Sequence, residues 1–350
     1  MTYYYGGKID EIPKNTSHLF FNDEFNDNID NLPNSIKYIK FGWCFNRTVD
    51  NLPNSITHLI FDGHFNKSID NLPNSITHLV FGIGFSQIIN KLPKSIIYLK
   101  FNSHFNQSIN GLLNSVKYLI FGYYYNKSVD NLPNSVTHLT FGYVFNQSIN
   151  KLPNSLTHLT LGYVFNQSVD NLPPSITHLT LSHYFNKRVD NLPNSITHLT
   201  FGYYFNQPID NLPNSITHLT LDWEYNGTID NLPNSIIYIN LGYKFNKSID
   251  KIIKFVKIFK FDNYSMYEKN KEKLTDKYVI YFYQCTYYYK FNNFCINNYS
   301  QIFLKSVCEL QYFTHTFLLQ KLTEYVFNPQ RLLRIAKEYN LTMDEYIDFL

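Results

Sequence analysis

The sequence contains little of what disulfide-rich, zinc-binding or membrane proteins require. Its 350 residues include four cysteines, Cys44, Cys285, Cys295 and Cys308, which show neither the paired spacing of a zinc site nor the density of a disulfide framework. No stretch approaches the roughly 18 consecutive apolar residues of a membrane span, and residues 1–9 lack the basic and apolar runs of a secretory signal. We therefore expect an intracellular, cytoplasmic protein that does not bind membranes.

An excess of charge of one sign is also missing. Lys and Arg number 30 against 27 Asp and Glu, and the first 250 residues hold 16 basic and 17 acidic side chains. Proteins that bind nucleic acids usually concentrate cations in one patch. We therefore expect no nucleic-acid partner.

Sequence motifs of catalysis are absent as well. The chain has no phosphate-binding glycine loop, nucleophile elbow, kinase signature or paired-cysteine metal motif. A candidate nucleophile and a candidate base occur together only in the C-terminal segment, where Cys285, Cys295 and Cys308 accompany His315. We expect that the protein is not an enzyme and needs no cofactor; the alternative is an enzyme with its site in this segment.

Internal repetition is what the sequence has in abundance. Written in rows of twenty residues, the chain from Thr16 to about Asp250 aligns in almost every column and gives twelve repeat cores. Tyr3 to Lys14 is a partial leading coil, and Ile252 to Phe261 is a degraded thirteenth. We number the columns of a repeat from one to twenty, so that Ile176 to Ser195 is one complete unit. This period predicts a solenoid in which each coil packs mainly against its neighbours.

Six columns of the repeat are apolar in nearly every core. They are the first, fourth, sixth, tenth, fourteenth and seventeenth, and one unit fills them with Val136, Leu139, Phe141, Phe145, Ile149 and Leu152. Burying each large apolar side chain contributes about 1.5 to 3 kcal/mol, but only when neighbouring coils cover it. A single repeat is therefore not expected to fold alone.

Columns three to six carry the pattern of a β-strand. Residues such as His138 to Phe141 alternate polar and apolar side chains and include β-branched and aromatic types. The seventh column is mostly Gly, Asn, Asp or Ser, which suits a turn. Leu and Pro in columns seventeen and eighteen favour an extended return leg, which leaves no room for a helix of about ten residues.

The eleventh column is Asn in every core except the one that carries Ser86. A stacked Asn can satisfy backbone groups of its own turn and of the adjacent coil. We therefore interpret this column as a structural ladder, which in the middle of the array consists of Asn126, Asn146, Asn166, Asn186 and Asn206.

The outward columns of the expected strands are the candidate binding surface. The third and fifth columns of five consecutive units are His and Thr, whereas the earlier fifth column holds Lys40, Ile60, Val80, Lys100 and Ile120. Aromatic residues in the eighth column suit protein recognition, since Tyr and Trp are frequent in binding hot spots; alternatively, they pack along the rim of the stack. The candidate partner-binding residues are His138, Thr140, His158, Thr160, His178, Thr180, His198, Thr200, His218, Thr220, Tyr143, Tyr163, Tyr203 and Trp223.

The histidine column also raises the question of a metal site. Strands in register would place successive rings about 4.7 to 4.9 Å apart. No carboxylate column flanks these histidines to orient them, and repetition alone produces the spacing. We therefore expect no metal.

The repeat resembles that of the FNIP repeat family. The resemblance rests on Phe and Asn, an Ile three residues later, and Leu-Pro, as in Phe145, Asn146, Ile149, Leu152 and Pro153, and it covers most of residues 3 to 261. The family is related in pattern to leucine-rich repeats, which implies a curved solenoid with a parallel sheet on one face. Many members carry an N-terminal F-box that docks a ubiquitin-ligase core; because the repeat signal starts at Tyr3, we expect no F-box in this chain.

The twenty-residue period ends near residue 261, and the change in sequence pattern predicts a second segment. We expect residues 1–261 to form a β-rich solenoid of about twelve coils, and residues 262–350 to form a Tyr- and Phe-rich, mainly α-helical cap. Residues 277–291 suggest a hairpin, and helical spacing from Gln301 to Val326 and a Thr-x-x-Glu capping box at Thr342 predict helices. An independent partner-binding module is the alternative to a cap.

These expectations together predict a protein–protein interaction scaffold that uses the exposed face of its sheet. A substrate-recognition subunit that acts with a ubiquitin ligase supplied in trans is a further alternative. The partner in either case would be a protein.

Overall fold

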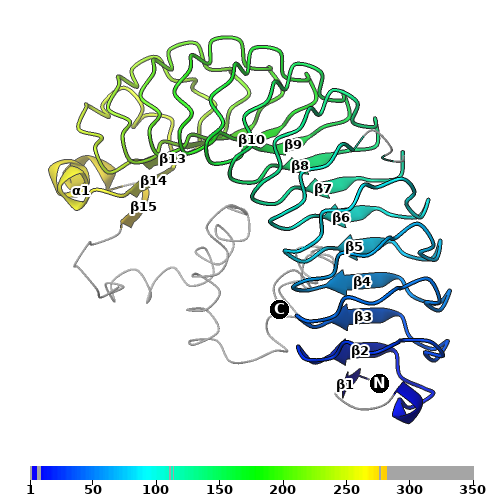
Figure 1. Cartoon of the computed structure of the whole chain (residues 1–350). Coiled ribbons are helices and arrows are strands. Elements are labelled where there is room, and N and C mark those ends of the chain that lie inside the picture. The colour runs from blue at the N-terminus through cyan, green and yellow to red at the C-terminus, as the bar shows by residue number, and fades with distance from the viewer. Residues whose placement is uncertain (1, 6–8, 110–111, 113, 276, 282–350) are drawn as a thin grey trace. The chain divides into compact units, whose positions relative to one another are not determined.

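The computed structural model describes residues 2–5, 9–109, 112, 114–275 and 277–281, which belong to one compact unit, Met1–Cys285. The strands of this unit form one parallel sheet of 15 strands whose spatial order follows the sequence (Figure 1). The strands are β1 (Thr2–Tyr5), β2 (His18–Phe21), β3 (Tyr38–Phe41), β4 (His58–Phe61), β5 (His78–Val80), β6 (Tyr98–Lys100), β7 (Tyr118–Ile120), β8 (His138–Thr140), β9 (His158–Thr160), β10 (His178–Thr180), β11 (His198–Thr200), β12 (His218–Thr220), β13 (Tyr238–Leu241), β14 (Ile258–Phe261) and β15 (Tyr278–Tyr281). The remaining elements are the short helices η1 (Ile9–Glu11), α1 (Tyr264–Asn270) and η2 (Lys271–Leu274).

The register of the sheet follows the period of the sequence. Each repeat strand pairs in parallel with the strand twenty residues later, so that Leu179 of β10 lies opposite Leu199 of β11. The parallel β-solenoid of about twelve coils of twenty residues is thereby confirmed. The partial leading coil and the degraded thirteenth coil add β1 and β14 to the same sheet.

The six apolar columns form the core of the solenoid, as the sequence predicts. In one unit Val136, Phe145 and Ile149 are at most 2% exposed, and the corresponding side chains of the other coils are buried in the same way. Within a coil the two inward Phe rings stack, as Phe61 does on Phe65 with ring centroids 3.8 Å apart. Each coil thus supplies one layer of a continuous apolar core.

Tight turns close each coil. The N–H of Ile176 donates to the carbonyl of Pro173 at 3.2 Å, and the N–H of Phe185 donates to the carbonyl of Ser182 at 3.2 Å. Leu172 and Pro173 therefore lie between two turns, and the return leg is less continuously extended than the sequence suggests. Close stacking explains the glycines of the seventh column, because a Cβ on Gly142 would lie 1.8 Å from the carbonyl oxygen of Gly122.

In one pair of neighbouring coils the spacing of stacked rings differs between the outer side of the sheet and the core. Between the coils of β4 and β5, the ring centroids of His58 and His78 are 4.2 Å apart on the outer side of the sheet. In the core of the same pair, the Phe61–Phe81 distance is 5.9 Å and the Phe65–Phe85 distance is 6.2 Å. Figure 1 shows that the sheet of this unit lies on the inner side of the bend and that the coils splay apart on the opposite side.

The end of the described region continues the sheet. Strand β15 pairs in parallel with β14, so the first residues of the expected hairpin form a further rung of the solenoid. Helix α1 begins after Asn263, whose side-chain oxygen accepts from the N–H of Ser265 at 3.0 Å. The helices expected after Gln301, and with them most of the expected cap, lie outside the described residues. None of the helices in the described part of the chain is long and apolar enough to cross a membrane.

Candidate functional site: the outer face of the sheet

Alternation along each strand places the third and fifth columns on the outer face of the sheet. In β10, His178 and Thr180 are partly exposed on either side of the buried Leu179. The register aligns His178 with His198 and Thr180 with Thr200 in β11. The ten His and Thr residues that the sequence predicts for β8 to β12 therefore lie on one surface, in two parallel rows.

The five histidines of β8 to β12 form an uninterrupted stack. Their neighbouring ring centroids are 4.1 to 4.2 Å apart, with interplanar angles of 8 to 13°. At either end of the run a tyrosine takes over, with Tyr118 at 4.4 Å from His138 and Tyr238 at 5.8 Å from His218. The row is thus a continuous aromatic ladder along the sheet.

A threonine hydroxyl orients each of these rings. Thr177 Oγ1 lies 2.9 Å from His178 Nδ1, and the same hydroxyl donates its hydrogen to the carbonyl of Thr157 at 3.2 Å. Because a hydroxyl carries a single hydrogen, the oxygen must accept from Nδ1–H of the neutral ring. This arrangement recurs with the same 2.9 Å distance at His138, His158, His198 and His218. It assigns the proton of the neutral ring to Nδ1 and leaves Nε2 as the acceptor.

The second and third columns of the repeat contain a sequence signal for this pairing. Wherever the third column is His, the second column is Thr or Ser; wherever the third column is Tyr, the second column is Lys or Ile. The four Tyr units are Lys37–Tyr38, Ile97–Tyr98, Lys117–Tyr118 and Ile237–Tyr238. All twelve cores follow this rule because an imidazole half-buried on the sheet needs a partner for Nδ1, which a hydroxyl supplies.

Burial lowers the proton affinity of the histidine row. Burial, together with the charge that protonated neighbours would carry, lowers the pKa of His138 and of His198 to about 4 and that of His178 to about 3. The pKa of His158 is also lowered by burial. These four histidines are therefore neutral at neutral pH, and burial contributes more to this than repulsion between the rings.

The aromatic residues of the eighth column stack along one rim of the sheet. Tyr143 and Tyr163 lie 4.3 Å apart, Tyr163 and His183 4.1 Å, and Trp223 and Tyr243 4.2 Å. Tyr203 joins the row between His183 and Trp223 at 4.8 and 5.6 Å. Tyr143 remains 37% exposed, so the row packs on itself along the rim and still offers aromatic surface to solvent.

The Asn column forms a ladder of hydrogen bonds from coil to coil. The Oδ1 atom of each Asn accepts from the backbone N–H of the Asn in the next coil, at 2.9 to 3.1 Å from Asn126 to Asn206. Asn166, Asn186 and Asn206 are exposed rather than buried, so these bonds lie at the surface of the turn. A second ladder, absent from the sequence analysis, uses the twentieth column, where Ser175 Oγ donates to the carbonyl of Leu156 at 2.7 Å.

The outward side chains of β13 and β14 form a buried polar cluster. Lys260 Nζ lies 3.0 Å from Asp262 Oδ1, and Asn240 Nδ2 donates to Asp262 Oδ2 at 3.2 Å. Lys260 is 7% and Asn240 4% exposed, and burial raises the pKa of the adjacent Tyr238. The ion pair compensates the buried ammonium group, which favours a structural role for this cluster.

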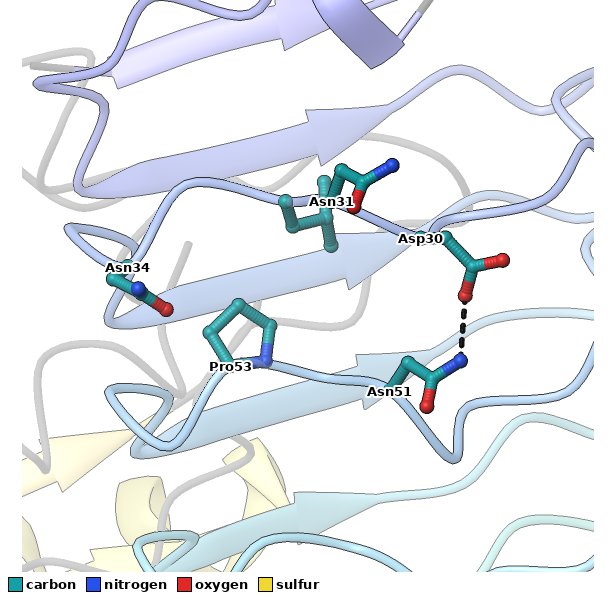
Figure 2. Close-up of a pocket in the computed structure, with 6 residues that line it drawn as sticks. Asp30, Asn31, Asn34, Asn51 and Pro53 are labelled. Carbon is teal, nitrogen blue, oxygen red and sulfur yellow. Dashed lines mark hydrogen bonds between the residues drawn. The ribbon is translucent and has the colours of Figure 1, made fainter.

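A shallow pocket lies between the first two return legs. Figure 2 shows Asp30, Asn31, Asn34, Asn51 and Pro53 around it, with Asn51 Nδ2 donating to Asp30 Oδ1 at 2.8 Å. The hydrogen bonds from Asn51 and Asn28 lower the pKa of Asp30. The same Asn-to-Asp bond recurs in later coils, for example from Asn211 to Asp190, so this carboxylate serves coil stacking.

Neither a metal site nor a cysteine-based catalytic site is formed by the described part of the chain. Among these residues, no three His, Cys, Asp or Glu side chains are arranged to hold a metal ion. Cys44 is exposed. The candidate nucleophiles Cys285, Cys295 and Cys308 and the candidate base His315 lie outside the described residues.

Comparison with protein-family models agrees with the repeat geometry. The model described as FNIP Repeat matches ten overlapping segments, residues 7–44, 27–64, 45–84, 85–124, 110–144, 125–164, 145–184, 165–204, 185–222 and 205–244. The matches cover more than half of the chain. Among curated proteins, no significant match is found.

Proposed function

This chain belongs to the FNIP repeat family, and we propose that it is a protein-interaction scaffold whose outer sheet face receives a partner protein. The observation that carries the proposal is the continuity of this face. Side chains of the third and fifth columns lie in register on neighbouring parallel strands and remain partly exposed from β8 to β12. Repeat proteins commonly use such an extended inner surface for binding.

The chemistry of the face suits a protein partner. Acceptor nitrogens of the histidines and hydroxyls of the threonines offer hydrogen bonds at each coil, and the eighth-column aromatics offer the ring surface that binding hot spots favour. Each coil adds only about 4.8 Å to the face, whereas a stable interface buries about 800 Å² on each partner. A partner must therefore span several neighbouring coils.

Substitutions on the face test the proposal. Thr160→Arg and Thr180→Arg would place bulky cations on the outer face, while Asn194→Arg adds the same side chain at an exposed turn. Circular dichroism would first establish that all variants fold. Proteins captured from source cells by the parent and by the Asn194 variant, quantified by mass spectrometry, should be lost with the two sheet-face variants. The same captured set for all four proteins would contradict the proposal.

A further inference from the structure

The fifth column divides the sheet face into two chemically different parts. From β8 to β12 it is Thr in every strand, whereas from β3 to β7 it runs Lys40, Ile60, Val80, Lys100 and Ile120. We name these five residues the mixed row. Their register makes each a direct neighbour of the next across the sheet. All five are partly exposed on the outer face, so a partner can contact them without unfolding a coil.

The mixed row has the anatomy of a small binding surface. Two adjacent aliphatic side chains, Ile60 and Val80, are flanked on both sides by the lysines. An apolar centre with a charged rim is the usual arrangement at protein interfaces. The five strands from β8 to β12 place Thr at the same position, so the aliphatic side chains are a local departure from that pattern.

Charge on this part of the face is one-sided. The second, third and fifth columns contain no Asp or Glu in any coil from β2 to β14, but they contain Lys37, Lys40, Lys100 and Lys117 between β3 and β7. Within the described part of the chain no carboxylate pairs with Lys100 or Lys117, while Lys40 Nζ lies 3.0 Å from Asp62. That pair is about two-fifths exposed on each side, and such surface pairs contribute little, so a partner's carboxylate can share Lys40.

We infer that the mixed row binds an extended protein segment that carries an acidic, an apolar and a second acidic side chain at alternate positions. The inference rests on the proposed scaffold function and adds the class of partner. Lys40 and Lys100 are three strands apart, about 14 Å at a strand spacing of about 4.8 Å. In an extended segment, residues i and i+4 lie on one side about 13 Å apart, with residue i+2 between them. Two acidic side chains at this separation meet the lysines, and the residue between them meets Ile60 and Val80.

The mixed row favours a protein segment over a nucleic acid. A nucleic acid carries a phosphate at every nucleotide, and its binding usually depends on several neighbouring cations. Here the two lysines of the row are separated by two aliphatic residues. A peptide with acidic and apolar side chains matches this arrangement, because each lysine lies next to one residue of the apolar pair.

A labelled peptide tests the inference on the full-length chain. The probe is fluorescein-labelled Ser-Glu-Ser-Leu-Ser-Glu-Ser, and matched probes carry Lys in place of Glu or Ser in place of Leu. Fluorescence anisotropy should show that the acidic, Leu-containing probe binds best and that added salt weakens it. Equal binding of the three probes would overturn the inference, as would tighter binding of a single-stranded oligonucleotide of the same charge.

Variants locate the binding site of the probe. Lys100→Thr and Val80→Thr introduce the residue that the same column uses from β8 to β12, so both should fold, and each should weaken binding about threefold to tenfold. Lys187→Thr and Val164→Thr make the same changes away from the row and should leave binding unchanged. Lys100→Glu should lose the acidic probe and gain affinity for the Lys probe. Equal effects of row and control substitutions would overturn the assignment.

The two proposals fail in distinguishable ways. If the probe ignores the mixed row but Thr160→Arg and Thr180→Arg still remove cellular partners, the scaffold function stands and the acidic segment is wrong. If neither the probe nor any cellular partner responds to substitutions on the sheet, both proposals are wrong.

Discussion

The sheet face from β8 to β12 and the face from β3 to β7 are built on the same core. They differ in how the outward rings of neighbouring strands stack. In the first part each histidine stacks on an identical neighbour, as His138 does on His158 at 4.1 Å. In the second part the third column mixes Tyr and His, so that His58 and His78 still stack at 4.2 Å but Tyr98 and Tyr118 are 6.2 Å apart. An unbroken run of histidines in adjacent parallel strands stacks ring on ring and becomes a ladder. A varied column leaves side chains available for a partner.

Deletions should have the largest effect on folding, and this effect should be the same in both parts of the sheet. Removing Ile176 to Ser195 joins Ser175 to Ile196 and restores every column, so a shorter solenoid should fold. Removing only Ile176 to Phe185 puts the following columns out of phase and should unfold the neighbouring coils. Circular dichroism and thermal melting report both outcomes.

The same pair of deletions at Ile56–Ser75 and at residues 56–65 extends this test to the other part of the sheet. Because the inward columns are the same in both parts, the results should match those above. Equal damage from ten-residue and twenty-residue deletions would contradict the coil assignment.

Acid should separate the two parts of the face. The lowered pKa values of His138, His178 and His198 mean that the unfolded chain, with histidines near 6.5, binds more protons than the folded chain as pH falls. Stability should therefore hold above about pH 6.5 and decline toward pH 4. Replacing the five histidines of β8 to β12 by Tyr should flatten the melting temperature between about pH 7 and 5.

The control for acid sensitivity is His58→Tyr with His78→Tyr. This pair stacks at 4.2 Å, but Tyr38 and Tyr98 border it, so it forms a shorter run and its replacement should change the pH profile less. Parallel loss of stability in the five-Tyr variant and the parent would show that the long histidine row is not responsible.

Breaking one hydroxyl–imidazole pair should have an intermediate effect. Thr177→Val removes the acceptor of His178 Nδ1–H and should lower the free energy of unfolding by about 1 kcal/mol, since the site is half-buried. Thr177→Ile combined with His178→Tyr installs the pair found at Ile97–Tyr98 and should recover part of that loss. Denaturant unfolding measures both; additive costs in the double variant would show that the two columns are not coupled.

The Asn ladder should show the smallest effect. Asn166→Ala removes the acceptor for the N–H of Asn186, but the site is exposed, so the cost should be about 0.5 to 1 kcal/mol. Gln167→Ala removes a surface hydrogen bond to Asn146 Oδ1 and should cost less, within about 0.5 kcal/mol. Indistinguishable denaturant midpoints would mean that the ladder contributes no more than an ordinary surface contact.

Much of the fold could be predicted because the same pattern of apolar and polar columns occurs in twelve repeats. The inward columns, the strand at columns three to six, the parallel register and the extra rungs at β1 and β14 all appear in the structure. The Ser ladder was not predicted although its column recurs, because Ser has many local hydrogen-bonding uses and only the stacked coils bring Ser175 Oγ to the carbonyl of Leu156. The parallel pairing of β15 with β14 was not predicted, because local composition does not encode which distant strand lies beside a segment.

The sequence by itself determined the period of the solenoid, the residues of its core and which columns face outward, since a fixed spacing of apolar residues admits one way of burying them all. The tertiary structure decided how the outward residues behave. The splay of the coils, the burial of each imidazole and the donation of each Thr hydroxyl to the preceding coil depend on atoms twenty residues away. Burial and hydrogen-bond direction set proton affinity and acceptor position, and both arise only when neighbouring coils are in contact.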